Sequence, residues 1–256
     1  MMRHPDPQQM REPSVLKATY RLLDEPDVTH AALCQPHGKA TREQAGRQAL
    51  VRLIQDTTDV DHTHHPKTRG LGPIGNGGGR GSLLQTVLAV LPEPRQGLGS
   101  AAQAPLLRQP APKGQSCAQR RARPRESQVW SRMVAAVGSI WVHVGDRYCD
   151  SFDVLEVCRL HHRDFLIRVA QDRRIEVAPG QLESLLTTVR AVPACDERAL
   201  ALPARDMQPA RIARVTLSFQ AATVHPPAHA RHKPPLAVWL IRVWEPNPPP
   251  EVVEPF

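Results

Sequence analysis

Proline restricts what this chain can fold into more than any other feature of its sequence. There are 26 prolines among 256 residues, about twice the usual share of ~5%. Because proline lacks a backbone donor and interrupts helices and central strands, we expect short elements joined by long irregular connections. Aromatic residues make up only 4% of the chain. The core must therefore consist mainly of leucine, valine, isoleucine and alanine, in a marginally stable fold.

The charge balance favours a negatively charged partner. The chain has 33 Lys and Arg against 25 Asp and Glu, a net charge of +8, which suits nucleic acid or an acidic membrane surface without distinguishing them. Its five cysteines are widely scattered, so neither a zinc knuckle nor a redox dithiol is indicated. No signal-like start and no stretch of ~18 apolar residues is present. We expect a soluble, reduced, cytoplasmic protein without a membrane partner.

The periodicity of apolar residues predicts an α/β region followed by a mainly β region. Apolar spacing indicates helices, and alternation or short apolar runs indicate strands. The predicted helices are 14–24, 29–46 (weaker, and interrupted around Pro36-His37-Gly38), 126–138, 152–162 and 181–192. The predicted strands are 49–54, 82–91, 97–107, 140–144, 165–169, 174–177, 210–219 and 236–243. The glycine-rich segment 69–81 between two strands must be a loop or a wide hairpin.

Two of the predicted strands each end in an aspartate. Asp56 follows the run 49–54, and Asp146 follows the run 140–144, 146 − 56 = 90 residues later. Because active sites of open α/β sheets lie at the carboxyl ends of strands, the two carboxylates would converge. Such a pair could bridge two Mg²⁺ or Mn²⁺ ions ~4 Å apart, as in phosphodiester chemistry. On pattern alone, however, turn or helix capping by each Asp is the more economical interpretation.

Three blocks of sequence, in the same order, resemble those of the insertion-sequence-four transposases, relatives of the transposon-five enzyme. The first catalytic segment resembles Leu53–Asp61 (LIQDTTDVD) with Arg69–Asn76 (RGLGPIGN), and the second resembles Trp141–Asp150 (WVHVGDRYCD). Asp164–Val169 (DFLIRV) is similar to the strand that opens the family's inserted β subdomain. Upstream, Lys17–Asp24 (KATYRLLD) is similar to the end of its helical DNA-contacting domain. The resemblance covers most of the chain, from about residue 13 onward.

The resemblance implies an α/β fold with an RNase-H-like core, a mainly β inserted subdomain and a short helical N-terminal remnant. Residues 1–46 would be the remnant of the DNA-binding domain, 47–163 the catalytic core, and 164–256 the inserted β subdomain with a truncated tail. Asp56 and Asp146 would be the catalytic metal ligands for Mg²⁺ or Mn²⁺, and the substrate would be double-stranded DNA at transposon ends. Arg147 would lie beside the metals and could contact a phosphate. An ordinary surface salt bridge explains Arg147 equally well.

Further basic residues are candidates for DNA contacts. Arg120, Arg121 and Arg123 lie in a proline-containing basic segment, 108–125, that could grip phosphates or serve only as a solvated linker. Arg80 flanks the glycine-rich segment and could also touch DNA. The histidines beside Asp61 lack a distant partner of recognised zinc type, so a solvated loop is the better interpretation.

One part of the family pattern has no counterpart. The third metal ligand is a Glu on a helix, in a Tyr-x2-Arg-x3-Glu-x6-Lys pattern, whereas Leu23 and Ser151 stand three residues after Tyr20 and Tyr148. We therefore expect the last core strand and the Glu helix to be missing, and the transposase fragment to be inactive alone. The alternative is a DNA-binding or oligomer-forming inhibitor of an intact transposase protomer. A third hypothesis is a defective product without function.

Overall fold

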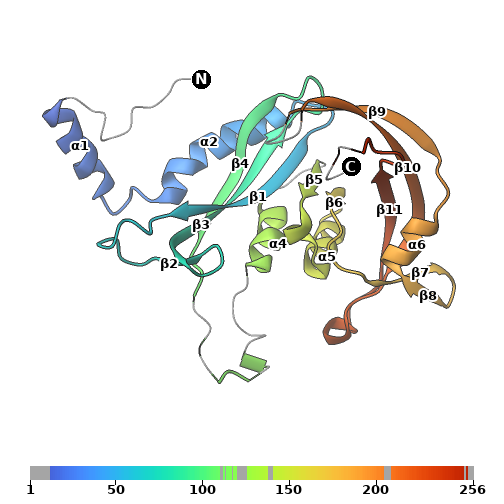
Figure 1. The fold of residues 1–256 in the computed structure, drawn as a ribbon. Coiled ribbons are helices and arrows are strands. Elements are labelled where there is room, and N and C mark those ends of the chain that lie inside the picture. The colour runs from blue at the N-terminus through green and yellow to red at the C-terminus, as the bar shows by residue number, and fades with distance from the viewer. Residues whose placement is uncertain are drawn as a thin grey trace. The chain divides into compact units, whose positions relative to one another are not determined.

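The computed structural model describes residues 12–109, 112, 114–116, 118–119, 126–137, 141–204, 209–250 and 252. The chain is a mixed α/β protein with two open sheets, drawn in Figure 1. It divides into two units, Met1–Arg168 and Val169–Phe256. The division falls five residues later than the expected boundary after residue 163.

The first unit carries the mixed sheet and most of the helices. In chain order its described elements are α1 (Pro13–Leu23), α2 (His30–Ala45), β1 (Arg52–Asp61), β2 (Gly72–Ile74), β3 (Gly79–Val90), β4 (Gly97–Leu106), α4 (Ser127–Ala136), β5 (Val142–Gly145), the 3-10 helix η2 (Arg147–Cys149), α5 (Phe152–Leu160) and β6 (Phe165–Ile167).

The strand order of this sheet places the first and fifth strands side by side. The order is β2-β3-β1-β5-β6. β4 also pairs with β3, along residues 83–90, whereas β2 pairs with residues 79–81. β3 runs antiparallel to β1, β2 and β4, whereas β5 is parallel to β1 and β6 is parallel to β5. The parallel pairs require crossovers, and the helices α4 and α5 lie in those connections.

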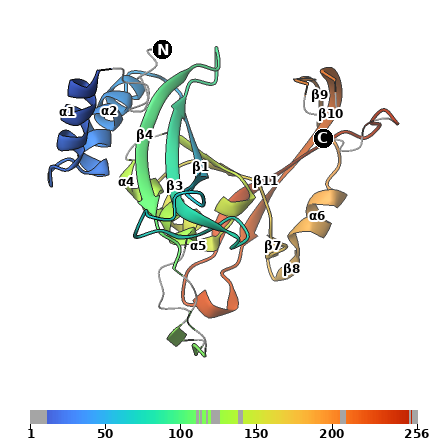
Figure 2. The same ribbon diagram turned by 60° about the vertical axis from the view of Figure 1, so that its left-hand side comes forward.

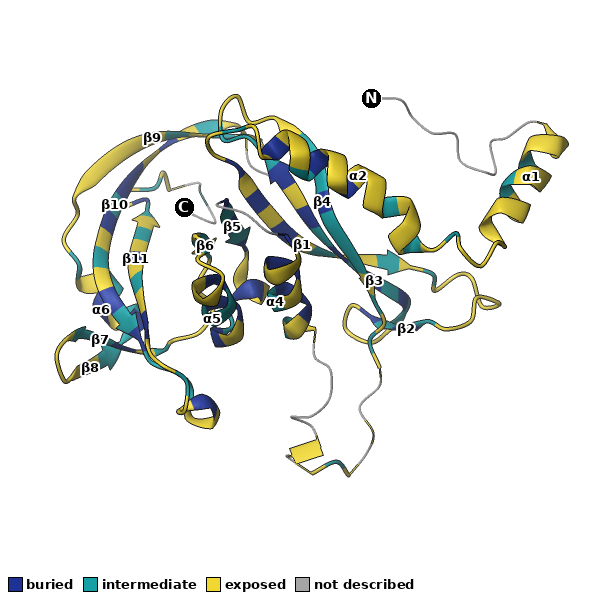
Figure 3. Ribbon diagram, turned by 180° about the vertical axis from the view of Figure 1, so that it is seen from behind, coloured by how far each residue is buried: buried dark blue, intermediate teal, exposed yellow. Residues whose placement is uncertain are grey.

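One face of the sheet is covered by helices. Leu53 of β1 and Val87 of β3 are fully buried and pack with Val129 and Met133 of α4 and with Ala45 of α2. A second cluster joins α4 to α5 through Trp130, Val134, Val154 and Cys158. Buried and exposed residues alternate along the first half of β1, visible as bands in Figure 3. The face that carries the exposed residues therefore points away from this core.

α2 is continuous through the segment where we expected an interruption. Pro36 lies inside the helix, and Thr29 caps its start by accepting a hydrogen bond from Ala32 N. The helix runs along β4 (Figure 2). A Cβ atom on Gly38 would lie 3.1 Å from the carbonyl oxygen of Ala101, so this glycine permits the close approach and does not end the helix. Residues 30–45 thus pack into the first unit, although we expected a separate DNA-binding remnant.

Two further predictions in the first unit need correction. β1 does not end before Asp56 but continues to Asp61, because β3 pairs with it along that whole length. β6 does not open the second sheet, since Phe165 lies opposite His143 in a parallel pairing with β5. β6 therefore lies at the end of the first sheet, next to β5. The glycine-rich segment does form a wide hairpin, through β2 and β3.

The second unit is an antiparallel sheet with one short helix. Its described elements are β7 (Arg174–Ala178), β8 (Gln181–Ser184), α6 (Leu185–Ala191), β9 (Asp196–Leu202), β10 (Arg211–Val224), the 3-10 helix η3 (Ala228–Ala230) and β11 (Leu236–Trp244). The strand order is β11-β10-β7-β8, and β9 also pairs with β10. The predicted helix 181–192 is wrong in its first third, because residues 181–184 pair with β7. The mainly β character of this region is confirmed.

Candidate metal centre

The first candidate metal ligand, Asp56, lies in β1, and the second, Asp146, directly follows β5, the parallel neighbour of β1. β1 and β5 are parallel, with Leu53 opposite His143 and Ile54 opposite Val144. Both chains stay extended for two more residues, since Asp146 has φ −80° and ψ −165°. Continuing the register places Asp56 beside Asp146, on strands spaced about 5 Å apart. The pairing of β1 with β5 thus relates two aspartates that are 90 residues apart in the sequence, each lying two residues past the last paired position.

Asp56 lies where β1 loses its parallel neighbour. β5 ends at Gly145, whereas β1 continues with β3 alone, and Asp56 is opposite Thr86 there. Asp56 is exposed on the sheet face that the core does not use. Among the described residues, none donates a hydrogen bond to its carboxylate. Its position is therefore inside a strand, beside the end of another, and both oxygens are accessible to a ligand.

Asp146 has a capping role in addition to its place beside Asp56. Its Oδ1 accepts a hydrogen bond of 2.9 Å from the backbone N–H of Tyr148, at the start of η2. The structure thus bears out the capping interpretation for Asp146. The capping bond uses one oxygen, and the residue remains exposed. Capping fixes the carboxylate in place, so it is compatible with a second role as a metal ligand.

Gly145 allows the chain to turn directly after β5. A Cβ atom at this position would lie 2.5 Å from both Cβ and Sγ of Cys149. The buried Cys149 side chain packs with Trp130 and Val134 of α4. Because η2 is held so close to the end of β5, the residue before Asp146 must be a glycine. Sequence reasoning missed this positioning role, although the Gly-Asp pair was visible.

A buried polar layer lies on the opposite face of the same two strands. Gln55 Nε2 and His143 Nδ1 are 3.2 Å apart, and both residues are almost fully buried. Burial lowers the pKa of His143 to about 4, with a smaller contribution from the positive charge of Arg163. His143 is therefore neutral at physiological pH. It holds β1 and β5 together directly behind the two carboxylates.

The donor set suits a hard divalent cation. Carboxylate oxygens are the ligands that Mg²⁺ and Mn²⁺ prefer, and two such groups can bridge a pair of ions. Within the described ranges, no group of three or more His, Cys, Asp or Glu side chains is placed to hold one ion. The pair thus offers part of a coordination sphere, and water or another acidic group must supply the rest.

No protein-family model matches this chain. No curated protein matches it either. None of the helices in the described part of the chain has the length and apolar character that a membrane span requires.

The predicted DNA-contacting residues differ in what the structure assigns to them. Arg147 is exposed in η2, directly after Asp146. Arg80 donates from Nη1 to the carbonyl of Pro66 and from Nη2 to that of Thr68, so it secures the loop between β1 and β2. Arg120, Arg121 and Arg123 lie outside the described residues. The ends of their segment are tied together, because Arg108 forms an ion pair with Glu126.

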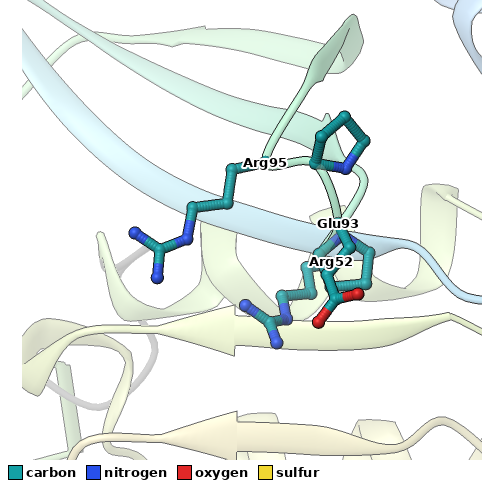
Figure 4. A pocket seen from close by; sticks show the side chains of 5 residues that line it. Arg52, Glu93 and Arg95 are labelled. Carbon is teal, nitrogen blue, oxygen red and sulfur yellow. The ribbon is translucent and has the colours of Figure 1, made fainter. Parts of the chain in front are cut away.

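A basic depression lies on the same strand as Asp56, at its beginning. It is lined by Arg52, Pro92, Glu93, Pro94 and Arg95, where the turn between β3 and β4 meets the start of β1 (Figure 4). Arg52 shares the exposed face of β1 with Asp56 and lies four residues, or about 13 Å, away along the strand. The sequence could have indicated that Arg52 shares a face with Asp56, since residues 52, 54 and 56 lie on one side of an alternating strand.

The histidine cluster after β1 has a structural explanation. Asp61 Oδ1 accepts hydrogen bonds from the backbone N–H and the hydroxyl of Thr63, and these bonds lower the pKa of the carboxyl. The rings of His62 and His65 meet edge to face, with centroids 6.0 Å apart. The segment is a largely exposed loop, as the sequence predicted.

Proposed function

We propose that Asp56 and Asp146 bind divalent cations in the core of a metal-dependent DNA strand transferase. The observation that carries the proposal is the parallel pairing of β1 with β5, whose register, continued by two residues, would put Asp56 level with Asp146. Sequence resemblance to the insertion-sequence-four transposases supports the same two residues. An RNase-H-like core is part of the proposal, supported by a mixed sheet in which the first and fifth strands are parallel neighbours.

Each residue of the site has a chemical task in this proposal. Mg²⁺ or Mn²⁺ bound there would activate water or a DNA 3′-hydroxyl and would stabilise charge on the phosphate. Asp56 and Asp146 supply the oxygen ligands, while Gly145 and the cap to Tyr148 fix Asp146. Arg147 directly follows Asp146, whereas Arg52 lies at the start of the exposed face of β1; both are exposed cations that would neutralise DNA phosphates. The proposed partner is double-stranded DNA.

We further propose that this chain cannot cleave DNA without a third acidic ligand. Two carboxylates give a weak metal site, because two-metal catalysis requires ligands that fix both ions in place. Cation binding and strand cleavage are therefore separable, and the first can be tested on this chain alone.

Metal titration of matched variants tests the site. Mn²⁺ binding is measured by calorimetry for the parent chain, Asp56→Asn, Asp146→Asn and Asp59→Asn. Asparagine at 146 keeps an oxygen that can cap η2, so the fold is preserved while the charge is lost. Asp59 is an exposed residue of the same strand but points to the opposite face, so its variant should bind as the parent does. The site is supported if Mn²⁺ binding is lost in Asp56→Asn and in Asp146→Asn but is kept in Asp59→Asn.

Equal affinity in all four proteins would refute it. Binding to duplex DNA, followed at increasing salt, tests the partner separately. We expect the logarithm of the affinity to fall linearly with the logarithm of salt concentration. Cleavage of duplex DNA by this chain with Mn²⁺ would overturn the requirement for a third ligand.

A further inference from the structure

β11 is an edge strand that lacks the usual protection of sheet edges. It spans nine residues, Leu236–Trp244, and lies at the end of its sheet. Among the described residues it pairs only with β10. Natural edge strands are commonly blocked by prolines, charges or bulges, because an open edge can pair with another chain. β11 has no proline, its pairing with β10 is unbroken, and seven of its nine residues are Leu, Val, Ile or Trp.

One face of β11 exposes a stripe of large apolar side chains. Trp239 is 66% exposed, Ile241 55% and Val243 38%. Phe219 of β10 lies opposite Ile241 and extends the stripe; its ring meets Trp239 edge to face, with centroids 5.8 Å apart. No charged side chain interrupts this stripe on β11. An apolar patch of this kind is typical of an interaction surface.

The one charge in the strand is turned to the other face and is occupied. Arg242 Nη1 donates a hydrogen bond of 3.0 Å to the carbonyl of Arg190, at the end of α6. Its guanidinium also lies 4.0 Å from the centroid of the Trp244 ring. Since Arg242 is held against its own sheet and helix, it does not guard the open edge.

We infer that β11 pairs antiparallel with β11 of a second copy of this chain, so that the two sheets become continuous. A two-fold axis at Leu240 is the arrangement that pairs all nine residues of the strand. It places Trp239 opposite the second copy's Ile241, Ala237 opposite Val243, Val238 opposite Arg242 and Leu236 opposite Trp244. Every pair on the exposed face is then apolar, and such cross-strand pairs stabilise a sheet.

The positive charge of the chain does not prevent this pairing. Each copy carries a net charge of +8, but only the charge close to the new edge matters at physiological salt. In the Leu240-centred register the two Arg242 residues lie four positions apart along the strands, about 14 Å. That separation exceeds the screening length of ~8 Å, so their repulsion is weak. The apolar pairs therefore decide the outcome.

Molar mass in solution tests the inference. We expect light scattering of the parent chain to show a monomer–dimer equilibrium that shifts to dimer with concentration. Ile241→Lys puts a charge in the centre of the proposed interface and should raise the dissociation constant at least tenfold. Ile212→Lys is the matched control: Ile212 is 73% exposed on β10, but it pairs with β9, outside the stretch covered by β11. This control should dimerise like the parent.

Both residues are exposed, so both variants should unfold like the parent when melting is followed at concentrations below the parent's dissociation constant, where association does not add to stability. A parent chain that stays monomeric at every concentration overturns the inference. A dimer that survives Ile241→Lys, or that is lost equally in Ile212→Lys, overturns it as well.

Disulfide formation tests the register in a Cys195→Ser background, which removes an exposed thiol. Trp239→Cys and Ile241→Cys proteins are oxidised separately and as a mixture. The Leu240-centred pairing predicts a disulfide between the two different variants, because positions 239 and 241 face each other. Crosslinks that form only between like variants would contradict this pairing.

Discussion

Gln55 and His143 join β1 to β5 through a buried contact of 3.2 Å between Nε2 and Nδ1. Gln55 directly precedes Asp56, and His143 lies three residues before Asp146, so the contact fixes the two strands that carry the proposed ligands. The second ring nitrogen of His143 has no partner among the described residues. Protonation would put a charge there without compensation.

The burial of His143 predicts that stability falls in mild acid. Its pKa is lowered from 6.5 to about 4, so the unfolded chain takes up the proton first as pH falls. Between these two values the unfolded state binds more protons, and stability is lost progressively, by up to about 3 kcal/mol. Urea unfolding across this pH window measures the loss. His143→Gln can keep a hydrogen bond to Gln55 but cannot titrate, and an unchanged pH dependence in that variant would contradict the assignment.

Gly145→Ala should disturb the proposed metal centre through η2, which packs against Gly145. The new methyl group would lie 2.5 Å from Cys149, and overpacking of this kind costs about 1–3 kcal/mol. We expect a lower melting temperature and weaker Mn²⁺ binding, since η2 carries the backbone donor that fixes Asp146. Gly97→Ala is the control, because a Cβ there meets nothing within 4 Å. Equal melting temperatures for the two variants would contradict the prediction, because they would show that η2 moves to accept the methyl group with no loss of stability.

The cysteines should differ sharply in reactivity. Burial raises the pKa of Cys149 and that of Cys158 to about 12, so their reactive thiolates are scarce at neutral pH. Cys195 is exposed and should be alkylated by iodoacetamide before Cys149 and Cys158. Peptide mapping by mass spectrometry, with and without urea, measures this. Modification of Cys149 or Cys158 in the native protein at the rate of Cys195 would count against the packing around α4 and α5.

The ion pair of Arg211 and Glu245 should contribute more to folding stability than the exposed ion pair of Arg198 and Asp196. Its two hydrogen bonds measure 2.5 and 2.8 Å, and Glu245 is only 8% exposed. Arg211→Met leaves a buried carboxylate without its bidentate partner, which costs about 3–5 kcal/mol. Arg198→Met removes the exposed pair with Asp196 and should cost less than about 1 kcal/mol. Chemical denaturation compares the two variants, and equal losses would refute the distinction.

The sequence alone determined the order of most elements and the candidate ligands. Amphipathic spacing located α4 and α5, because a helix buries residues at fixed intervals along its own length. Alternation located β10 and β11 for the same local reason. Asp56 and Asp146 stood out because each adjoins an apolar run; in the structure Asp56 lies in β1, and Asp146 directly follows β5, which pairs with β1. These are properties of short segments, and they do not depend on which other segments pack against them.

Pairing between distant segments was decided only by the tertiary structure. Polar residues from Asp56 to Asp61 looked like the end of a strand, but β3 pairs with every one of them and so extends β1, although none of the six is buried. β6 belongs to the first sheet because it pairs in parallel with the edge of β5. The Gln55–His143 contact and the open edge of β11 likewise depend on which strands become neighbours. Partner choice rests on contacts far apart in sequence, and no local pattern encodes it.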